Sequence, residues 1–164
     1  MKKVIIIILV VFLILAIILG TIGFLVFRFL NKEKDSITAN EFKKAFEEKD
    51  FIVVDVAEQF AEFSHIKKVY LAIEKDNNYQ IEFYQISDEE SAIEFYNNNK
   101  SIFESYKGNT STETNLAISN YAKYTLSANG QYMVVSRIDN TVIYVDVDSS
   151  YKDEVQDLLE NIGY

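Results

Sequence analysis

The sequence predicts an α+β domain, with an antiparallel sheet of about seven strands flanked by helices, behind an N-terminal transmembrane helix. Residues 4–27 contain no charged side chain, which predicts the membrane segment. Seven later segments are rich in β-branched and aromatic residues, and short polar turns join many of them. Three amphipathic segments divide these strands into groups of three and four, so the expected order is α-β3-α-β4-α.

The apolar span is long enough to cross a bilayer as a helix. Its 24 residues would extend about 36 Å at ~1.5 Å per residue, against a hydrocarbon core of ~30 Å. We therefore expect an anchor within residues 1–30, which runs through Val4, Phe12, Leu19 and Phe27. A cleaved signal peptide is the alternative, because Lys2 and Lys3 resemble its basic start. Its apolar region is normally shorter, at roughly 7–15 residues, and no small-x-small cleavage pattern closes the span.

Basic residues flank the span almost equally. Lys2 and Lys3 precede it, and Arg28, Lys32 and Lys34 follow, so the positive-inside rule gives nearly a tie. Only three residues lie ahead of the span, which favours a cytoplasmic N-terminus and an extracytoplasmic C-terminal domain. The expected localisation is therefore the cell membrane, with a single pass. A domain that faces the cytoplasm as an interaction module is the open alternative.

The remaining sequence is strongly acidic. Residues 31–164 hold all 25 acidic and 13 of the 16 basic residues, a formal net charge of −12. Such a domain repels phosphate backbones, so no nucleic-acid partner is expected. The chain has no cysteine, and no cofactor is expected. We divide this part into a charged linker, residues 31–36, and a globular domain, residues 37–164.

The first helix is predicted from a capping box at Thr38–Glu41, with Ile37 and Phe42 as a hydrophobic staple. A second box, Ser87–Glu90, predicts the next helix, and Ser150 is the expected cap of the last. The apolar stripes agree: Phe42, Ala45 and Phe46; Ala92, Ile93, Tyr96, Phe103 and Tyr106; and Val155, Leu158, Leu159 and Ile162, with Gly163 as the C-terminal cap.

The expected strands lie between these helices. They are Phe51–Val56, a segment around Val69, Leu71 and Ile73, Gln80–Ile86, Leu116–Ser119, Tyr121–Ser127, Tyr132–Ile138 and Thr141–Val147. Asn109–Asn115 is expected to be a loop or the entry to an edge strand. Asn129-Gly130 predicts a type I′ hairpin, since that turn needs positive φ at both central residues. Short hairpins within each group favour antiparallel pairing.

This element order resembles the PsbP-like fold, a seven-stranded antiparallel sheet flanked by helices. The resemblance covers roughly Ile37–Tyr164 and rests on the order of elements; the β-hairpin that often precedes the pattern is missing. The chain is also similar to small membrane-anchored proteins of low-GC Gram-positive bacteria, rich in Asn, Lys, Ile and Tyr. Neither resemblance supplies a catalytic residue.

One acidic run begins like a calcium-binding loop. Asp146, Asp148 and Ser150 occupy positions 1, 3 and 5 of an EF-hand register, and Asp157 occupies position 12. Position 6 is Tyr151, where the loop requires glycine, and the bidentate glutamate is absent. Acids at the positive end of a helix dipole give a simpler interpretation, so these residues are a weak calcium candidate and no metal site is expected.

No catalytic signature is present. His65 is the one histidine, and the chain has no cysteine to accompany it in a zinc site. Ser149 and Lys152 have Ser-x-x-Lys spacing but no companion motif. We therefore expect no enzyme. An enzyme or calcium-dependent module whose residues converge only in space is the open alternative.

Four strand tyrosines, Tyr70, Tyr84, Tyr124 and Tyr144, could form a binding row on an exposed sheet face. Helices on both faces would instead make them core, which is the favoured interpretation. The expected function is a non-catalytic extracytoplasmic domain that binds a protein, a cell-envelope component or a small ligand near the membrane.

Overall fold

The computed structural model describes residues 15–28 and 33–164, and the chain forms two compact units, Met1–Glu33 and Lys34–Tyr164. In the first unit residues 15–28 are helical, and the large apolar side chains there, Leu19 and Phe27 included, are exposed. Within the described ranges, no helix combines the length and the apolar character needed to span a bilayer. Val4 and Phe12 of the expected anchor lie outside the described residues.

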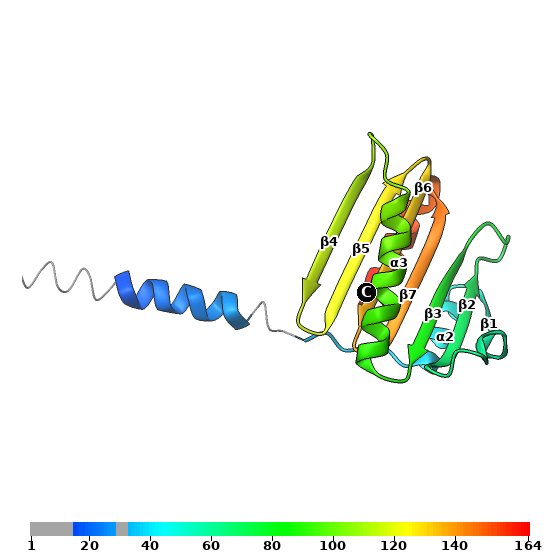
Figure 1. Cartoon of the computed structure of the whole chain (residues 1–164), viewed down its shortest axis with the longest axis horizontal. Coiled ribbons are helices and arrows are strands. Elements are labelled where there is room, and N and C mark those ends of the chain that lie inside the picture. Colours follow the sequence, from blue (N-terminus) through cyan, green and yellow to red (C-terminus); the bar gives the residue numbers. More distant parts are fainter. Residues whose placement is uncertain (1–14, 29–32) are drawn as a thin grey trace, which may run out of the picture. The chain divides into compact units, whose positions relative to one another are not determined.

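The second unit is built on one antiparallel sheet in the order β1-β2-β3-β7-β6-β5-β4 (Figure 1). The strands are β1 Ile52–Asp55, β2 Ile66–Ile73, β3 Gln80–Ile86, β4 Thr112–Ile118, β5 Tyr121–Ala128, β6 Gln131–Ile138 and β7 Thr141–Asp148. The helices are α2 Ala39–Glu47, α3 Glu89–Ser105 and α4 Lys152–Asn161, with 3-10 turns η1 Ala57–Phe60 and η2 Ser149–Tyr151. The predicted α+β class, seven antiparallel strands and α-β3-α-β4-α order are confirmed.

Two meanders make up the sheet. β1 to β3 form the first and β4 to β7 the second, and α3 connects them. The meanders join where Glu82–Gln85 of β3 pairs with Thr141–Tyr144 of β7. The predicted type I′ turn is confirmed, with φ of 53° at Asn129 and 79° at Gly130. β4 is longer than predicted because its polar first half pairs in register with β5.

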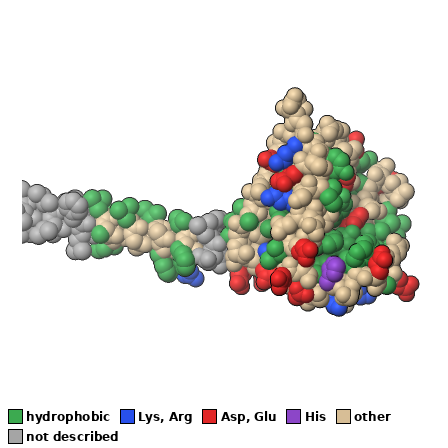
Figure 2. Space-filling model, in the orientation of Figure 1, with side chains coloured by type: hydrophobic (Ala, Val, Ile, Leu, Met, Phe, Trp, Pro, Cys, Tyr) green, Lys and Arg blue, Asp and Glu red, His purple; other side chains and the backbone are tan. Residues whose placement is uncertain are grey.

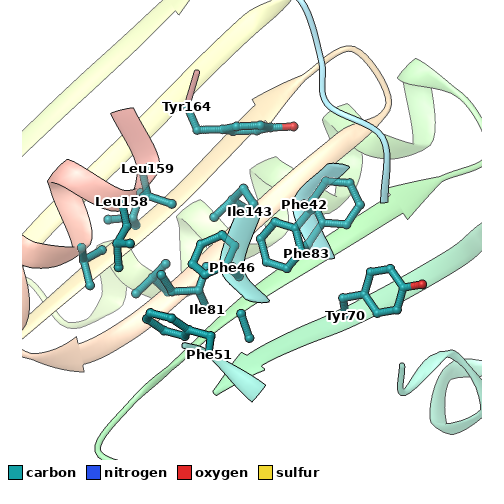
Figure 3. Packing of buried hydrophobic residues seen from close by; sticks show 14 of the residues in the cluster. Phe42, Phe46, Phe51, Tyr70, Ile81, Phe83, Ile143, Leu158, Leu159 and Tyr164 are labelled. Carbon is teal, nitrogen blue, oxygen red and sulfur yellow. The ribbon is translucent and has the colours of Figure 1, made fainter. Parts of the chain in front are cut away.

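α2 and α4 cover one face of the sheet, which we call the closed face (Figure 3). Aromatic rings fill it: Phe42 lies 4.5 Å from Phe46 and 4.9 Å from Phe83, measured between ring centroids. The Tyr164 ring is also buried there, and its hydroxyl contacts Thr141 Oγ1. The two helices cover the middle strands, while the edge strands β1 and β4 remain mostly exposed.

α3 packs on the opposite face, which we call the open face. Tyr84, Tyr124 and Tyr144 lie on this face and Tyr70 on the other, because strand side chains alternate. Tyr70, Tyr84 and Tyr124 are buried, so the interpretation of these rings as core is confirmed for them. The tyrosines therefore form no exposed row.

The capping box at the start of α2 is confirmed. Thr38 N–H donates to Glu41 Oε2 at 2.7 Å, and Glu41 N–H donates to Thr38 Oγ1 at 3.2 Å. Ile37 and Phe42 pack into the same core cluster, as the staple requires. Gly163 has a φ of +90° after α4, which fits its predicted capping role.

Two other predicted caps are wrong by one or two residues. Asp88, and not Ser87, caps α3 by accepting from Ser91 N–H at 2.8 Å, because a carboxylate reaches this amide in place of the hydroxyl. Asp148 accepts from Ser150 N–H at 2.8 Å and caps η2, whereas α4 begins without a side-chain cap.

The predicted apolar stripe of α3 is too wide. Ala92, Tyr96 and Phe103 are buried, but Ile93 is 40% exposed and Tyr106 50%. One helix on a sheet buries a narrow stripe, and both residues lie outside it.

Candidate binding groove

A groove of about 360 Å³ opens on the open face between α3 and the segment that leads from η1 into β2. Figure 2 shows the histidine among apolar side chains, with carboxylates to either side. The groove is lined by Phe60, Phe63, His65, Ile66, Ser91, Glu94, Phe95, Asn98 and Asn99. A volume near the lower end of ligand pockets, roughly 300–1,000 Å³, can accept one large side chain or a small molecule.

Backbone hydrogen bonds fix the wall that comes from the η1–β2 segment. Phe63 N–H donates to Phe60 O and Ile66 N–H donates to Phe63 O, both at 2.9 Å. Ser87 N–H donates to His65 O at 2.7 Å, which holds this segment against the start of α3. The pairing of β2 with β3 shifts register between Ile66 and Lys68, and such a bulge redirects the chain at the groove.

The other wall is one face of α3. Ser91, Glu94, Phe95 and Asn98 follow the i, i+3, i+4, i+7 spacing of a helix face that is distinct from the buried stripe. Buried Arg137 of β6 ties the start of α3 to the sheet: its Nη1 donates to Glu89 Oε1 at 3.1 Å and to Asp139 O at 2.9 Å. Hydrogen bonds to neighbouring elements therefore hold both walls of the groove in place.

Two of the aromatic rings that line the groove, those of Phe60 and Phe95, pack against the buried Tyr84 ring. The Tyr84 ring lies 5.7 Å from Phe60 and 4.7 Å from Phe95, between ring centroids. Burial, and then the charge of Glu82, raise the pKa of the Tyr84 phenol, so it stays protonated and donates to Glu82 Oε2. The ring that packs against Phe60 and Phe95 is therefore uncharged.

Ser91 and Asn99 donate to Asp88 Oδ2 and Phe95 O, and the other polar side chains that line the groove make no hydrogen bond in the part of the chain that the structure describes. Within the described residues, neither the Glu94 carboxylate, the Asn98 amide nor the His65 imidazole makes a hydrogen bond. The Phe63 ring lies 6.2 Å from the His65 ring and is 45% exposed. An apolar floor with free polar groups at its edge is suited to binding, because the rim can orient a ligand that the floor desolvates.

The calcium candidate is not assembled as a loop. Asp146 and Asp148 lie in β7, Ser150 in η2 and Asp157 in α4, which packs on the closed face. Alternation puts Asp146 and Asp148 on the open-face side of β7, and Asp148 is already occupied by Ser150. Among the residues that the structure describes, no three His, Cys, Asp or Glu side chains gather to hold a metal ion.

The groove was not foreseen. The sequence gives His65 no partners for a zinc site, and the structure places it in the turn before β2, where it lines the groove. Ser149 and Lys152 lie elsewhere, at η2 and α4. The sequence signals that would have found the site are Phe60-x-x-Phe63 and the second face of α3.

No protein-family model, curated protein or solved structure matches the chain. The site is therefore interpreted from the chemistry of its own residues. That chemistry comprises four apolar side chains, Phe60, Phe63, Ile66 and Phe95, and the polar rim above them.

Proposed function

We propose that this chain is a single-pass membrane protein whose extracytoplasmic domain binds a partner through the groove and catalyses no reaction. The observation that carries the proposal is the groove itself, which presents an uncovered apolar floor beneath unpaired polar groups. Exposed apolar surface of this kind marks binding sites on folded proteins.

The proposal that the groove binds a partner can be tested on the full chain in phosphatidylcholine nanodiscs. An uncharged hexapeptide with one central phenylalanine is expected to shift the NMR signals of Phe63, Phe95 and Asn98. Phe63→Ala should abolish these shifts. Ile102→Ala removes a side chain that is also exposed on α3 but does not line the groove, so it should preserve them. Shifts that persist in Phe63→Ala, or that spread evenly over the sheet, would contradict the proposal.

The membrane half rests on the uncharged span Val4–Phe27 and on its length. In the proposed topology the N-terminus is cytoplasmic and the domain lies outside. Protease added to intact cells should then remove the domain. A domain that resists protease until the cells are lysed would show that it faces the cytoplasm.

We also propose that the domain is PsbP-like. The support is the shared order of elements around a seven-stranded antiparallel sheet. An experimental structure whose strand order departs from β1-β2-β3-β7-β6-β5-β4 would remove that support.

A further inference from the structure

Acidic residues outnumber basic ones around the groove. Glu58 lies two residues before Phe60, Glu62 lies directly before Phe63, and Glu90 and Glu94 follow one another at i, i+4 on α3. In the described part of the chain, none of these four carboxylates forms an ion pair. Glu94 lines the groove, and the other three carboxylates lie on the segments that form its two walls, which favours a cationic ligand.

The neighbouring cations are already engaged. Lys67 Nζ donates to Ser64 O at 2.9 Å, and Lys68 Nζ lies 2.6 Å from Asp55 Oδ2. Arg137 is buried against Glu89. Lys68 and Arg137 are therefore paired with carboxylates, whereas Lys67 keeps its charge. One lysine against Glu58, Glu62, Glu90 and Glu94 still leaves an excess of negative charge near the groove.

Asparagines line the same edge and suit a peptide. Asn99 Nδ2 donates to Phe95 O at 2.8 Å, which leaves its side-chain oxygen as an acceptor. Asn98 keeps both its donor and its acceptor. Paired donors and acceptors match the amide groups of a peptide backbone, whereas a hydrocarbon ligand would leave them without partners.

Resting on the proposed function, we propose that the groove binds a peptide segment with an aromatic or large aliphatic side chain next to a lysine or arginine. The apolar side chain enters between Phe63 and Phe95. The neighbouring cation pairs with Glu94. Asn98 and Asn99 bind the peptide backbone.

The test compares three hexapeptides on the full chain in phosphatidylcholine nanodiscs, by NMR titration. Each carries one central phenylalanine, followed by lysine, glutamine or glutamate. A rim charge pair is worth up to about 1 kcal/mol, so the lysine peptide should bind roughly fivefold more tightly than the glutamine peptide. The glutamate peptide should bind least tightly, and added salt should shrink the differences.

Two matched variants locate the charge effect. Glu94→Gln should reduce the preference for the lysine peptide while leaving the glutamine peptide unchanged. Glu160→Gln removes an acid on α4, whose apolar residues pack on the closed face, and should change neither. Phe63→Ala should abolish the signal shifts that each of the three peptides causes.

The outcomes separate the two proposals. Equal affinity for the three peptides, or tightest binding of the glutamate peptide, overturns the cationic ligand and leaves the binding function standing. A preference that survives Glu94→Gln unchanged also overturns the assigned contact. Failure of every peptide to shift the groove signals overturns both proposals.

Discussion

The two faces of the sheet differ in how completely helices cover them: of the described helices, two pack on the closed face and one on the open face. On the closed face, α2, α4 and a buried Tyr164 cover the strands, and Phe46 is 1% exposed. On the open face, α3 and the 3-10 turn η1 lie apart. Phe63 lines the groove between α3 and the segment after η1, and it remains 45% exposed. A lone helix cannot cover so wide a sheet, so the uncovered area becomes the groove.

Because the two faces differ in coverage, we expect aromatic residues on them to differ in their effect on stability. A buried ring on the closed face contributes to the free energy of unfolding, because removing it leaves a cavity. A half-exposed ring on the open face contributes little to folding, since water already reaches it. Comparison of the two faces therefore predicts which aromatic residues stabilise the fold and which serve binding.

The largest expected effect comes from a pair of phenylalanines. Phe46→Ala should lower the free energy of unfolding by about 3–5 kcal/mol, as for other buried rings. Phe63→Ala should lower it by less than ~1 kcal/mol, because the side chain is near the surface. Urea denaturation of both variants measures the contrast. Similar losses would show that the segment after η1 is part of the core and that the open face is not distinct.

The fold was predictable because its signals are local. Thr38 and Glu41 lie three residues apart, and Asn129-Gly130 specifies its own turn, so short-range chemistry fixes these positions. The cap at Ser87 failed because α3 starts one residue later, where the Asp88 carboxylate accepts from Ser91 N–H. Ser150 failed because it lies inside η2, and its own N–H donates to Asp148. Sequence spacing alone does not decide which acceptor reaches an N–H group.

The groove was not predictable for a different reason. Its walls come from segments about 30 residues apart, Phe60–Ile66 and Ser91–Asn99, and they meet only when β2 and β3 pair. Phe60-x-x-Phe63 and the second face of α3 are its sequence signals, but without the fold they do not reveal that the two segments meet. His65 became relevant only through its position beside Phe63.

The second-largest expected effect on stability comes from removing the N-terminal cap of α2 or of α3. Thr38→Ala removes the cap of α2, and Asp88→Ala removes the cap of α3; each should cost about 1 kcal/mol of stability. Only Asp88→Ala should also weaken peptide binding, because α3 forms a wall of the groove. Urea denaturation and the NMR titration measure the two effects.

Ser150→Ala is the control, since its hydroxyl caps no helix. It should change stability by less than ~0.5 kcal/mol. Weaker binding in Thr38→Ala, at a temperature where the chain is fully folded, would contradict the independence of the two faces.

The smallest expected effect is a loss of stability in acid, to which both faces contribute. Hydrogen bonds from Thr38, its backbone N–H first, hold the pKa of Glu41 below its ordinary value of 4.5. The Ser87 hydroxyl, followed by Ser91 N–H, holds the pKa of Asp88 below 3.8. A lowered pKa in the folded state means that each carboxylate stabilises the fold fully above its ordinary value, and that this stabilisation is lost as the pH falls through the folded value.

The urea midpoint should therefore fall as the pH is lowered below about 4.5, with both groups contributing. Glu41→Gln should remove the part that belongs to α2. Asp88→Asn should remove the part that belongs to α3 while keeping a cap, because asparagine also accepts from the helix N–H groups. If neither variant flattens the acid slope, these caps do not carry the pH dependence. If the two reductions add in the double variant, the start of each helix responds to acid on its own, as two separately packed faces require.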